Sequence, residues 1–385
     1  MSAVYLDHAA TTPVRDEVLA AMAPFTADVF GNPSSLHRWG RAASAALEDA
    51  RAELAEALGA TRSEIRFVRG GTESDNLAIL GSCRAVRSAA RGVPPLAVTR
   101  IEHSAVLEAA GHLAISREAA VTWIDVAPDG TLDLDGIVEV ARARDATISV
   151  MWANNETGLL LPVADVTTAV APHGATVHTD ASQALGKVPV SVADVTVHLL
   201  TGTGHKINGP RGMGFLFVRE GTRLSPLLHG GGQERALRPG TEDVASAVGL
   251  ATAARLAVSE QTSFATRADA LRSRLEQGLI SALGELRINC VEGPRAPHVS
   301  SIGLPGVEDG VTLLMALDLE GVAVSGGSAC HSGAGRGSHV IAALYGDEDD
   351  TATVRFSFGR LTTETDIDRA IEATASVMRR LRSAA

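Results

Sequence analysis

Short runs rich in β-branched residues alternate with alanine-rich amphipathic segments between about residue 60 and residue 220. The runs with the character of strands lie at 65–68, 96–99, 121–124, 147–152, 176–179, 195–200 and 214–218. The segments between them, such as 135–144 and 165–170, have helical spacing. Strands that alternate with helices assemble into a mostly parallel sheet covered by helices. The pattern therefore predicts an α/β fold with a mostly parallel, seven-stranded sheet.

The last third of the chain predicts further helices and a second group of strands. Residues 250–283 are rich in Ala and Leu, contain no Pro and have the periodicity of one or more long helices. Strand candidates follow at 299–304 and 354–358, and a final helix is expected at about 364–381. The long helical stretch is expected to lead from one domain into the other.

The length of 385 residues allows one or two hydrophobic cores, because domains usually contain about 100 to 200 residues. We expect a large domain over residues 13–255 and a small α+β domain made of residues 1–12 and 256–385. The small domain would carry a loop at about 325–337, SGGSACHSGAGRG, in which Cys330 stands among five glycines.

Charge and cysteine count exclude several classes of protein. The chain has 34 Lys and Arg against 45 Asp and Glu, a net charge of -11, so no broad basic surface for nucleic acid is predicted. Cys83, Cys290 and Cys330 are odd in number and far apart, which fits neither a disulfide framework nor a zinc site. Asp7 and His8 interrupt the N-terminus, and no apolar run is long enough to span a bilayer. We expect a soluble cytoplasmic protein without a metal site, a membrane contact or a direct nucleic-acid ligand.

Polar residues of catalytic type follow five of the predicted strands. They are Thr72, His103, Asn155, the pair Asp180 and Gln183, and Lys206. Taken singly, each has an ordinary explanation as a turn residue, a helix cap or a surface side chain. In open α/β sheets, however, ligands bind outside the carboxyl ends of the strands. The coincidence of these residues at one predicted edge therefore indicates a binding site.

Lys206 stands in the glycine-rich stretch TGTGHKINGPRG. ATP binding is disfavoured, because the GxxxxGK[ST] pattern of a P-loop is absent and Ile207 follows the lysine. A lysine in a tight, partly desolvated loop suits covalent chemistry with an aldehyde cofactor. The turn at Gly70-Gly71-Thr72 could hold a phosphate at a helix N-terminus. With Asp180 for a pyridinium nitrogen and His103 to stack on a ring, the set predicts a site for pyridoxal 5'-phosphate.

Ten motifs extend this prediction along the chain. They are YLDHAATTP (5–13), GNPSS (31–35), GGTESDNLAI (70–79), EHSAVLE (102–108), NNETG (154–158), HTDASQALGK (178–187), GHKINGPRG (204–212), RPGTED (238–243), SGGSACHSG (325–333) and VRFSFGR (354–360). In order and spacing the chain resembles the cysteine desulfurases of the NifS/IscS type, within the class V aminotransferase superfamily. The resemblance runs from residue 5 to beyond residue 370 and implies a fold-type I pyridoxal-phosphate enzyme.

The resemblance implies a role for each residue at the cofactor. Lys206 would bond covalently to the cofactor aldehyde and afterwards move the substrate α-proton. His103 would stack on the ring and assist proton transfer, while Asp180 would keep the ring nitrogen protonated. Gln183 would hydrogen-bond the ring hydroxyl. The phosphate would be bound by Gly71, Thr72, Thr203, His205 and, from a partner subunit, Thr241.

The resemblance also implies the substrate site and the nucleophile. Asn155, beside the cofactor, and Arg355 would bind the carboxylate of L-cysteine, Arg355 as a bidentate fork. The thiolate of Cys330 would attack the substrate sulfur and carry it as a persulfide, while alanine leaves. A homodimer and a sulfur-acceptor protein are implied as partners. Relatives of this kind serve iron–sulfur cluster assembly, tRNA thiolation, thiocofactor synthesis and DNA phosphorothioation.

Three other interpretations compete with a desulfurase. A selenocysteine lyase or another class V enzyme would share the cofactor residues, and a non-catalytic scaffold would keep the fold with a degenerate site. A metal site at Cys330 and His331 is disfavoured, because adjacent residues rarely ligate one ion together. The chain also departs from the family pattern. Arg69 precedes the GGT turn where relatives often have a small residue, and His331 with three further glycines follows Cys330.

Overall fold

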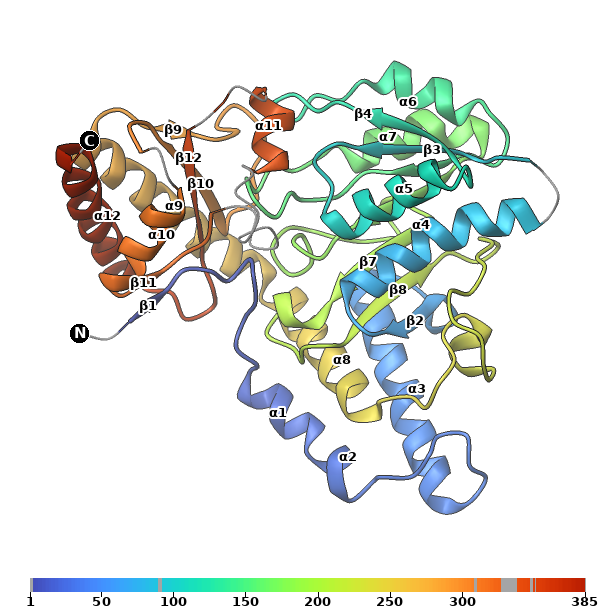
Figure 1. The fold of residues 1–385 in the computed structure, drawn as a ribbon. Helices are drawn as coiled ribbons and strands as arrows, with labels where there is room; N and C mark the ends of the chain where they lie inside the picture. Colours follow the sequence, from blue (N-terminus) through green and yellow to red (C-terminus); the bar gives the residue numbers. More distant parts are fainter. Residues whose placement is uncertain are drawn as a thin grey trace.

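A seven-stranded sheet organises the larger part of the molecule (Figure 1). The computed structural model describes residues 3–88, 92–307, 310–326, 338–346, 349 and 351–384. The strand order is β2 (Ile65–Val68), β8 (Gly214–Val218), β7 (Leu199–Thr203), β6 (Thr176–Asp180), β5 (Thr147–Ser149), β3 (Pro95–Thr99) and β4 (Ala120–Ile124). Within this sheet β8 pairs antiparallel with both neighbours, and the other pairs are parallel. The predicted α/β fold is confirmed.

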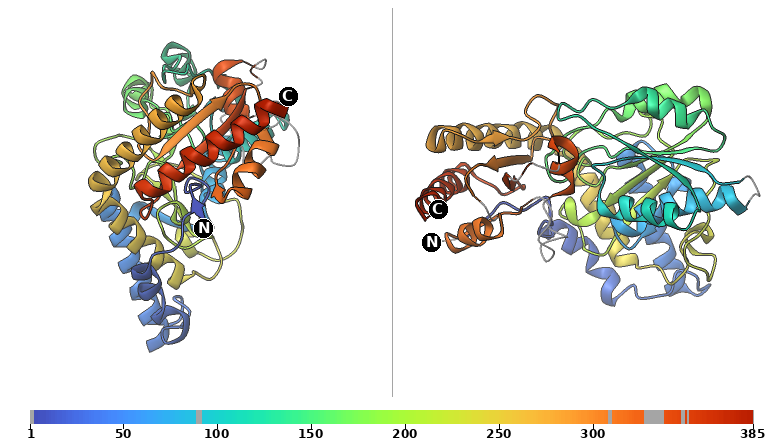
Figure 2. Two further views of the ribbon diagram at one scale, coloured as in Figure 1. Left: turned by 90° about the vertical axis from the view of Figure 1, so that its left-hand side faces the viewer. Right: turned by 45° about the horizontal axis from the view of Figure 1, so that its top comes forward.

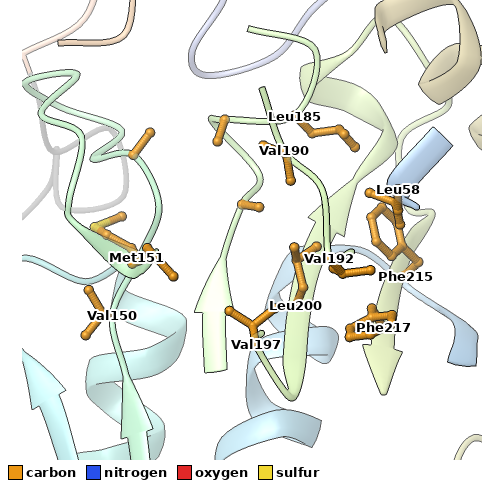
Figure 3. Close-up of a cluster of buried hydrophobic side chains, with 14 of the residues drawn as sticks. Leu58, Val150, Met151, Leu185, Val190, Val192, Val197, Leu200, Phe215 and Phe217 are labelled. Carbon is orange, nitrogen blue, oxygen red and sulfur yellow. The ribbon is translucent and has the colours of Figure 1, made fainter. Parts of the chain in front are cut away.

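Helices cover both faces of the large sheet. One face packs against α3 (Arg38–Leu58), α6 (Leu134–Ala141), α7 (Val163–Val170) and α8 (Val244–Ser259), and the other against α4 (Gly71–Ser88) and α5 (Ser104–Ile115). Successive strand residues point to opposite faces. Leu200 and Phe215 therefore join the first cluster, which Figure 3 shows, while Leu199 and Leu216 pack with Leu77 of α4.

A second group of strands and helices lies beside the large sheet, as Figure 2 shows, and it encloses a buried cluster of its own. Its antiparallel sheet has the order β12 (Ala352–Ser357), β10 (Val299–Leu304) and β9 (Arg287–Ile288), and β1 (Val4–Tyr5) pairs parallel with β11 (Val322–Ala323). It packs against α9 (Gln261–Leu283), α10 (Gly310–Leu319) and α12 (Glu364–Ala384). The division into domains 13–255 and 1–12 with 256–385 stays a prediction.

Three short helices complete the chain that the structure describes around these two clusters. They are α1 (Asp16–Met22), α2 (Pro24–Ala27) and α11 (His339–Tyr345). Although α11 lies late in the sequence, its Val340 and Leu344 are part of the cluster on the large sheet. Ser325 thus pairs with β12 of the small sheet, whereas α11 packs on the large one.

One predicted strand begins four residues later than expected. The sequence predicts a strand at 195–200, but β7 covers Leu199–Thr203. Val195 belongs to a turn, because its N–H donates to Ser191 O at 3.1 Å. Local propensity does not favour a strand at Gly202, because glycine weakens a strand. Glycine is required here because the ring of Phe215, its partner on β8, occupies the space of a side chain.

Gly202 supplies a test of this packing. A Cβ atom at Gly202 would lie 2.3 Å from the Phe215 ring, whereas a Cβ at Gly111 in α5 meets no atom within 4 Å. Gly202→Ala should therefore lower the free energy of unfolding by about 1–3 kcal/mol through overpacking. Gly111→Ala should raise it by about 0.5–1 kcal/mol, because alanine favours a helix. Urea unfolding of both variants checks this, and equal stability would contradict the strand assignment.

Candidate active site

A cavity of about 300 Å³ opens at the carboxyl ends of the parallel strands. Of the residues that the sequence indicated, those brought together there are Gly71, Thr72, His103, Asn155, Asp180, Gln183, Thr203, His205, Lys206 and Arg355. They come from both sheets and from the loops between them. Thr241 is exposed and does not line this cavity, and Cys330 lies outside the described residues.

Lys206 is held at the cavity by the N-terminal segment. It follows β7 in a 3-10 turn, Gly204–Lys206, and its Nζ donates to Ala9 O and, at 2.7 Å, to Ala10 O. The amide of Gln183 donates to Ala9 O at 2.9 Å. The sequence predicts no role for Ala9 and Ala10, because backbone carbonyls leave no trace in side-chain chemistry.

The N-terminus of α4 lies at one end of the cavity and could hold an anion there. Gly70 has φ 95°, a conformation that favours glycine, and α4 begins directly after it at Gly71. The first N–H groups of an α-helix have no partner within the helix and attract a phosphate. A Cβ at Gly71 would be in ordinary contact, 3.4 Å from the hydroxyl of Ser182. Ser182 lines the same cavity and was not predicted.

The guanidinium of Arg69 is paired with a carboxylate. Its Nη1 donates to the carboxylate of Asp243 at 2.9 Å, and its backbone N–H donates to Glu73 Oε2 at 2.8 Å. The sequence left open whether this guanidinium supports the phosphate site or faces water. The structure shows it paired beside the cradle, with its side chain about half exposed at 48%.

Buried polar groups lie under the floor of the cavity. Asp180 ends β6, and its Oδ1 accepts from Ser182 N at 2.8 Å. Asp75 and Glu102 are buried nearby, and burial followed by the charge of Asp180 raises the pKa of both, that of Glu102 to about 8. Burial lowers the pKa of His178 to about 4. The pKa shifts of Asp75, Glu102 and His178 thus favour the neutral forms of the groups around Asp180.

Three imidazoles line the cavity, those of His103, His205 and His339. The Nδ1 atom of His103 accepts from Ala105 N at 3.1 Å and so caps α5, and burial lowers the pKa of this histidine. A neutral ring that accepts at Nδ1 carries its proton on Nε2. His339, at the start of α11, was not predicted. Its Nε2 lies 3.1 Å from Glu102 O, which accepts from it. Only tertiary structure brings these distant residues together.

Arg355 is buried and oriented for an anion. Its Nη2 donates to Asp7 Oδ1 at 2.7 Å and its Nη1 to Asn155 O at 2.8 Å. Its Nε is buried and has no hydrogen-bond partner among the described residues. Asn154 builds the adjoining turn, because its Oδ1 accepts from the N–H groups of Glu156 and Thr157. The guanidinium is therefore fixed at the cavity wall before any ligand arrives.

The two cysteines that the structure describes do not suit nucleophilic chemistry. Cys83 and Cys290 are both buried. Burial raises the pKa of the Cys290 thiol and raises that of Cys83 to about 12, and a thiol reacts as its thiolate. In the described ranges no cluster of three or more His, Cys, Asp or Glu residues is placed to hold a metal. No helix in those ranges is long and apolar enough to cross a membrane.

Lys187 is a buried lysine beneath Lys206. Its Nζ donates to Lys206 O at 3.1 Å and lies 5.0 Å from the centre of the Phe264 ring. The side chains of His8 and His298 are close enough for its charge to lower their pKa values, after the larger effect of burial. Burial lowers the pKa of Lys187 itself to about 8.

This shift predicts a pH dependence of stability. The pKa of Lys187 is about 8 in the folded chain against the ordinary 10.5, so the unfolded chain binds more protons between these pH values. The stability contribution of Lys187 therefore rises as pH increases through this window. Relative to Lys187→Met, the cofactor-free wild type should gain roughly 3 kcal/mol in free energy of unfolding from pH 7.5 to 10.5. A constant difference between the two proteins over that range would contradict the prediction.

The chain resembles known proteins over its whole length. Residues 4–370 match the family described as Aminotransferase class-V. The IscS-like cysteine desulfurase of Mycobacterium tuberculosis (strain ATCC 25618 / H37Rv) is 40% identical over 385 residues, 99% of this chain and 98% of that protein. Cysteine desulfurase NifS of Azotobacter vinelandii is 41% identical over 387 residues, 100% of this chain and 94% of that protein. A solved NifS-like protein superposes with a TM-score of 0.88 at 33% identity, covering 98% of this chain and 99% of that one. The chain belongs to the class V aminotransferase family and, within it, to the cysteine desulfurases of the NifS/IscS type.

Proposed function

We propose that the residues around the cavity carry out the conversion of L-cysteine to L-alanine with transfer of its sulfur to Cys330. Cysteine desulfurase is the activity of the chain's relatives at about 40% identity over their full length. Those names favour a desulfurase over a selenocysteine lyase or another class V enzyme. The observation that carries the assignment of residues is the meeting of Lys206, Asp180, His103 and Arg355 at one cavity.

Enzymes of this family use pyridoxal 5'-phosphate, and the residues present fit it. The glycine cradle at the start of α4, with Thr203 and His205, suits a phosphate. Asp180 suits a protonated ring nitrogen, and Gln183 suits the ring hydroxyl. When bound, the cofactor supplies an electron sink that weakens bonds at the α-carbon of an amino acid. Lys206 supplies the amine that holds it.

The protein's own groups orient the substrate and move its proton. The guanidinium of Arg355, which lines the cavity, donates to the carboxylate of L-cysteine together with the side-chain amide of Asn155. The amine of Lys206 accepts the α-proton and returns a proton to the product carbon. His103 carries its own proton on Nε2 and stabilises the ring face. Because Asp7 and Asn155 O hold the guanidinium, little ordering is needed when substrate binds.

Cys330 is the proposed nucleophile. Its thiolate attacks the substrate sulfur, an S–S bond forms, the carbon–sulfur bond breaks, and the carbon leaves as alanine after protonation. The described chain on either side of it in sequence reaches the cavity wall: Ser325 pairs with Arg355, and the hydroxyl of Ser338 donates to Glu156. These two contacts support the assignment of the nucleophile to Cys330. The sulfur then passes to an acceptor protein.

Substitution of Cys330 tests this assignment. Cys330→Ala should abolish sulfide release from L-cysteine in the presence of a reductant, because neither of the two described thiols, Cys83 and Cys290, lines the cavity. The yellow colour of the bound cofactor should remain. Cys83→Ala is the matched control, since it removes a buried thiol outside the cavity. Undiminished turnover by Cys330→Ala would overturn the role of this residue.

A homodimer with shared sites is proposed from Thr241. This residue is exposed and does not line the cavity of its own chain. Its position is therefore consistent with a contribution to the phosphate site of a second copy. Lys206→Ala and Thr241→Val chains should each be impaired alone. When the two are unfolded together and refolded, hybrid dimers should contain one intact site, giving about a quarter of wild-type activity. No gain on mixing, or an active monomer in sedimentation, would contradict sharing.

The sulfur acceptor and the compartment are proposed on chemistry alone. A persulfide passed from one thiol to another requires a reducing compartment, which favours the cytoplasm. The acceptor is proposed to be a protein of iron–sulfur cluster assembly, tRNA thiolation, thiocofactor synthesis or DNA phosphorothioation. Transfer of labelled sulfur from Cys330 to candidate acceptors distinguishes these pathways.

A further inference from the structure

A left-handed turn interrupts the loop between β8 and α8. Glu234, Arg235 and Ala236 have φ values of 46°, 56° and 62°. Residues with a Cβ rarely adopt this conformation, and three in succession are strained. Such strain persists only where the surrounding structure imposes it. The contacts of this turn should therefore show what imposes it.

A buried ion pair fixes the turn. The Oε2 and Oε1 atoms of Glu234 accept from Nη1 and Nη2 of Arg51 at 2.7 and 2.8 Å, and Oε2 also accepts from Phe67 N at 2.9 Å. The Glu234 side chain is 2% exposed and that of Arg51 7%. Arg51 belongs to α3 and Phe67 to β2. A single carboxylate thus joins the turn to a helix and to the sheet.

The chain beyond the turn returns to the phosphate cradle. Nε of Arg238 donates to Glu73 Oε1 at 3.0 Å, and Asp243 accepts from Arg69. Glu73 stands in the first turn of α4, one residue after Thr72, and its other oxygen accepts from Arg69 N. Arg69 and Glu73 flank the cradle at Gly71 and Thr72 in sequence, and both are therefore bound by residues of segment 238–243.

We propose that Arg238 is a positioning residue for the phosphate cradle. Its guanidinium neutralises the charge of Glu73, and the Arg51–Glu234 ion pair holds Arg238 within reach of Glu73. This inference rests on the proposed function, since it takes Gly71 and Thr72 as the phosphate site. An unpaired carboxylate beside the cradle would oppose a dianionic phosphate by Coulomb repulsion. The guanidinium cancels this repulsion and also fixes the side chain that caps the first turn of α4.

The experiment compares ligands with and without the phosphate. Cofactor-free full-length protein is titrated with pyridoxal 5'-phosphate and with pyridoxal, and binding is followed by absorbance. Arg238→Gln should weaken pyridoxal 5'-phosphate binding about three- to tenfold, because it exposes the Glu73 charge to the phosphate. Binding of pyridoxal should change less than about twofold, since it carries no phosphate. Glu73→Gln in the Arg238→Gln background should restore most of the loss.

Matched variants separate this effect from general damage. Arg84→Gln removes a half-exposed ion pair with Glu118 at the other end of α4 and should leave both affinities unchanged. Glu234→Gln should weaken binding of the phosphate form selectively. Glu276→Gln, which breaks a similarly buried pair with Arg295, should not.

Three results would overturn the proposal. The first is an Arg238→Gln protein that binds pyridoxal 5'-phosphate as tightly as the wild type. The second is an equal loss of affinity for pyridoxal 5'-phosphate and pyridoxal. The third is a selective loss of affinity for pyridoxal 5'-phosphate that Glu73→Gln does not restore. A wild type that binds neither ligand would instead refute the proposed function.

Discussion

The contact between the Lys206 amine and the carbonyls of Ala9 and Ala10 joins the two sheets at the cavity. The same N-terminal segment reaches the small sheet, where Ala9 N donates to the hydroxyl of Ser357 at 2.8 Å. Asp7 binds Arg355 two residues before Ala9. Residues 7–12 thus form a seam that fixes the amine from the large sheet and the guanidinium from the small one in a single cavity. A substrate that needs both groups is bound only when this seam is intact.

Burial sets the charges around that seam. Lys187 and His298 lie beneath Lys206 and Gln183, and Glu102 lies beneath Asp180. Burial raises the pKa of Glu102 to about 8 and lowers that of His298, which favours the neutral form of both near pH 7. Lys187, whose pKa burial lowers only to about 8, is still mostly protonated there. In a medium of low dielectric constant its charge acts strongly on nearby groups, and it lowers the pKa of His8 and His298.

Much of the fold and of the site could be predicted because strand ends and glycine turns are local signals. Asp180, His103 and Lys206 follow strands whose β-branched runs are visible in sequence, and all three line the cavity. His339 was missed because its contact with Glu102 joins residues 237 positions apart. The strand at Leu199–Thr203 was displaced in the prediction because the ring of Phe215 compensates for Gly202, which local propensity does not reveal. The assignments of Cys330 and Thr241 stay predictions.

The left-handed turn at Glu234 has a consequence for the order of folding. Its residues disfavour the left-handed backbone conformation that they adopt. The partners that impose this conformation, Arg51 and Phe67, are 183 and 167 residues away in the chain. Closing such long loops is slow compared with forming local helices. We therefore expect the turn to take its form only after α3 and β2 have assembled. The proposed brace of the phosphate cradle would then form late in folding, and binding of the cofactor would follow it.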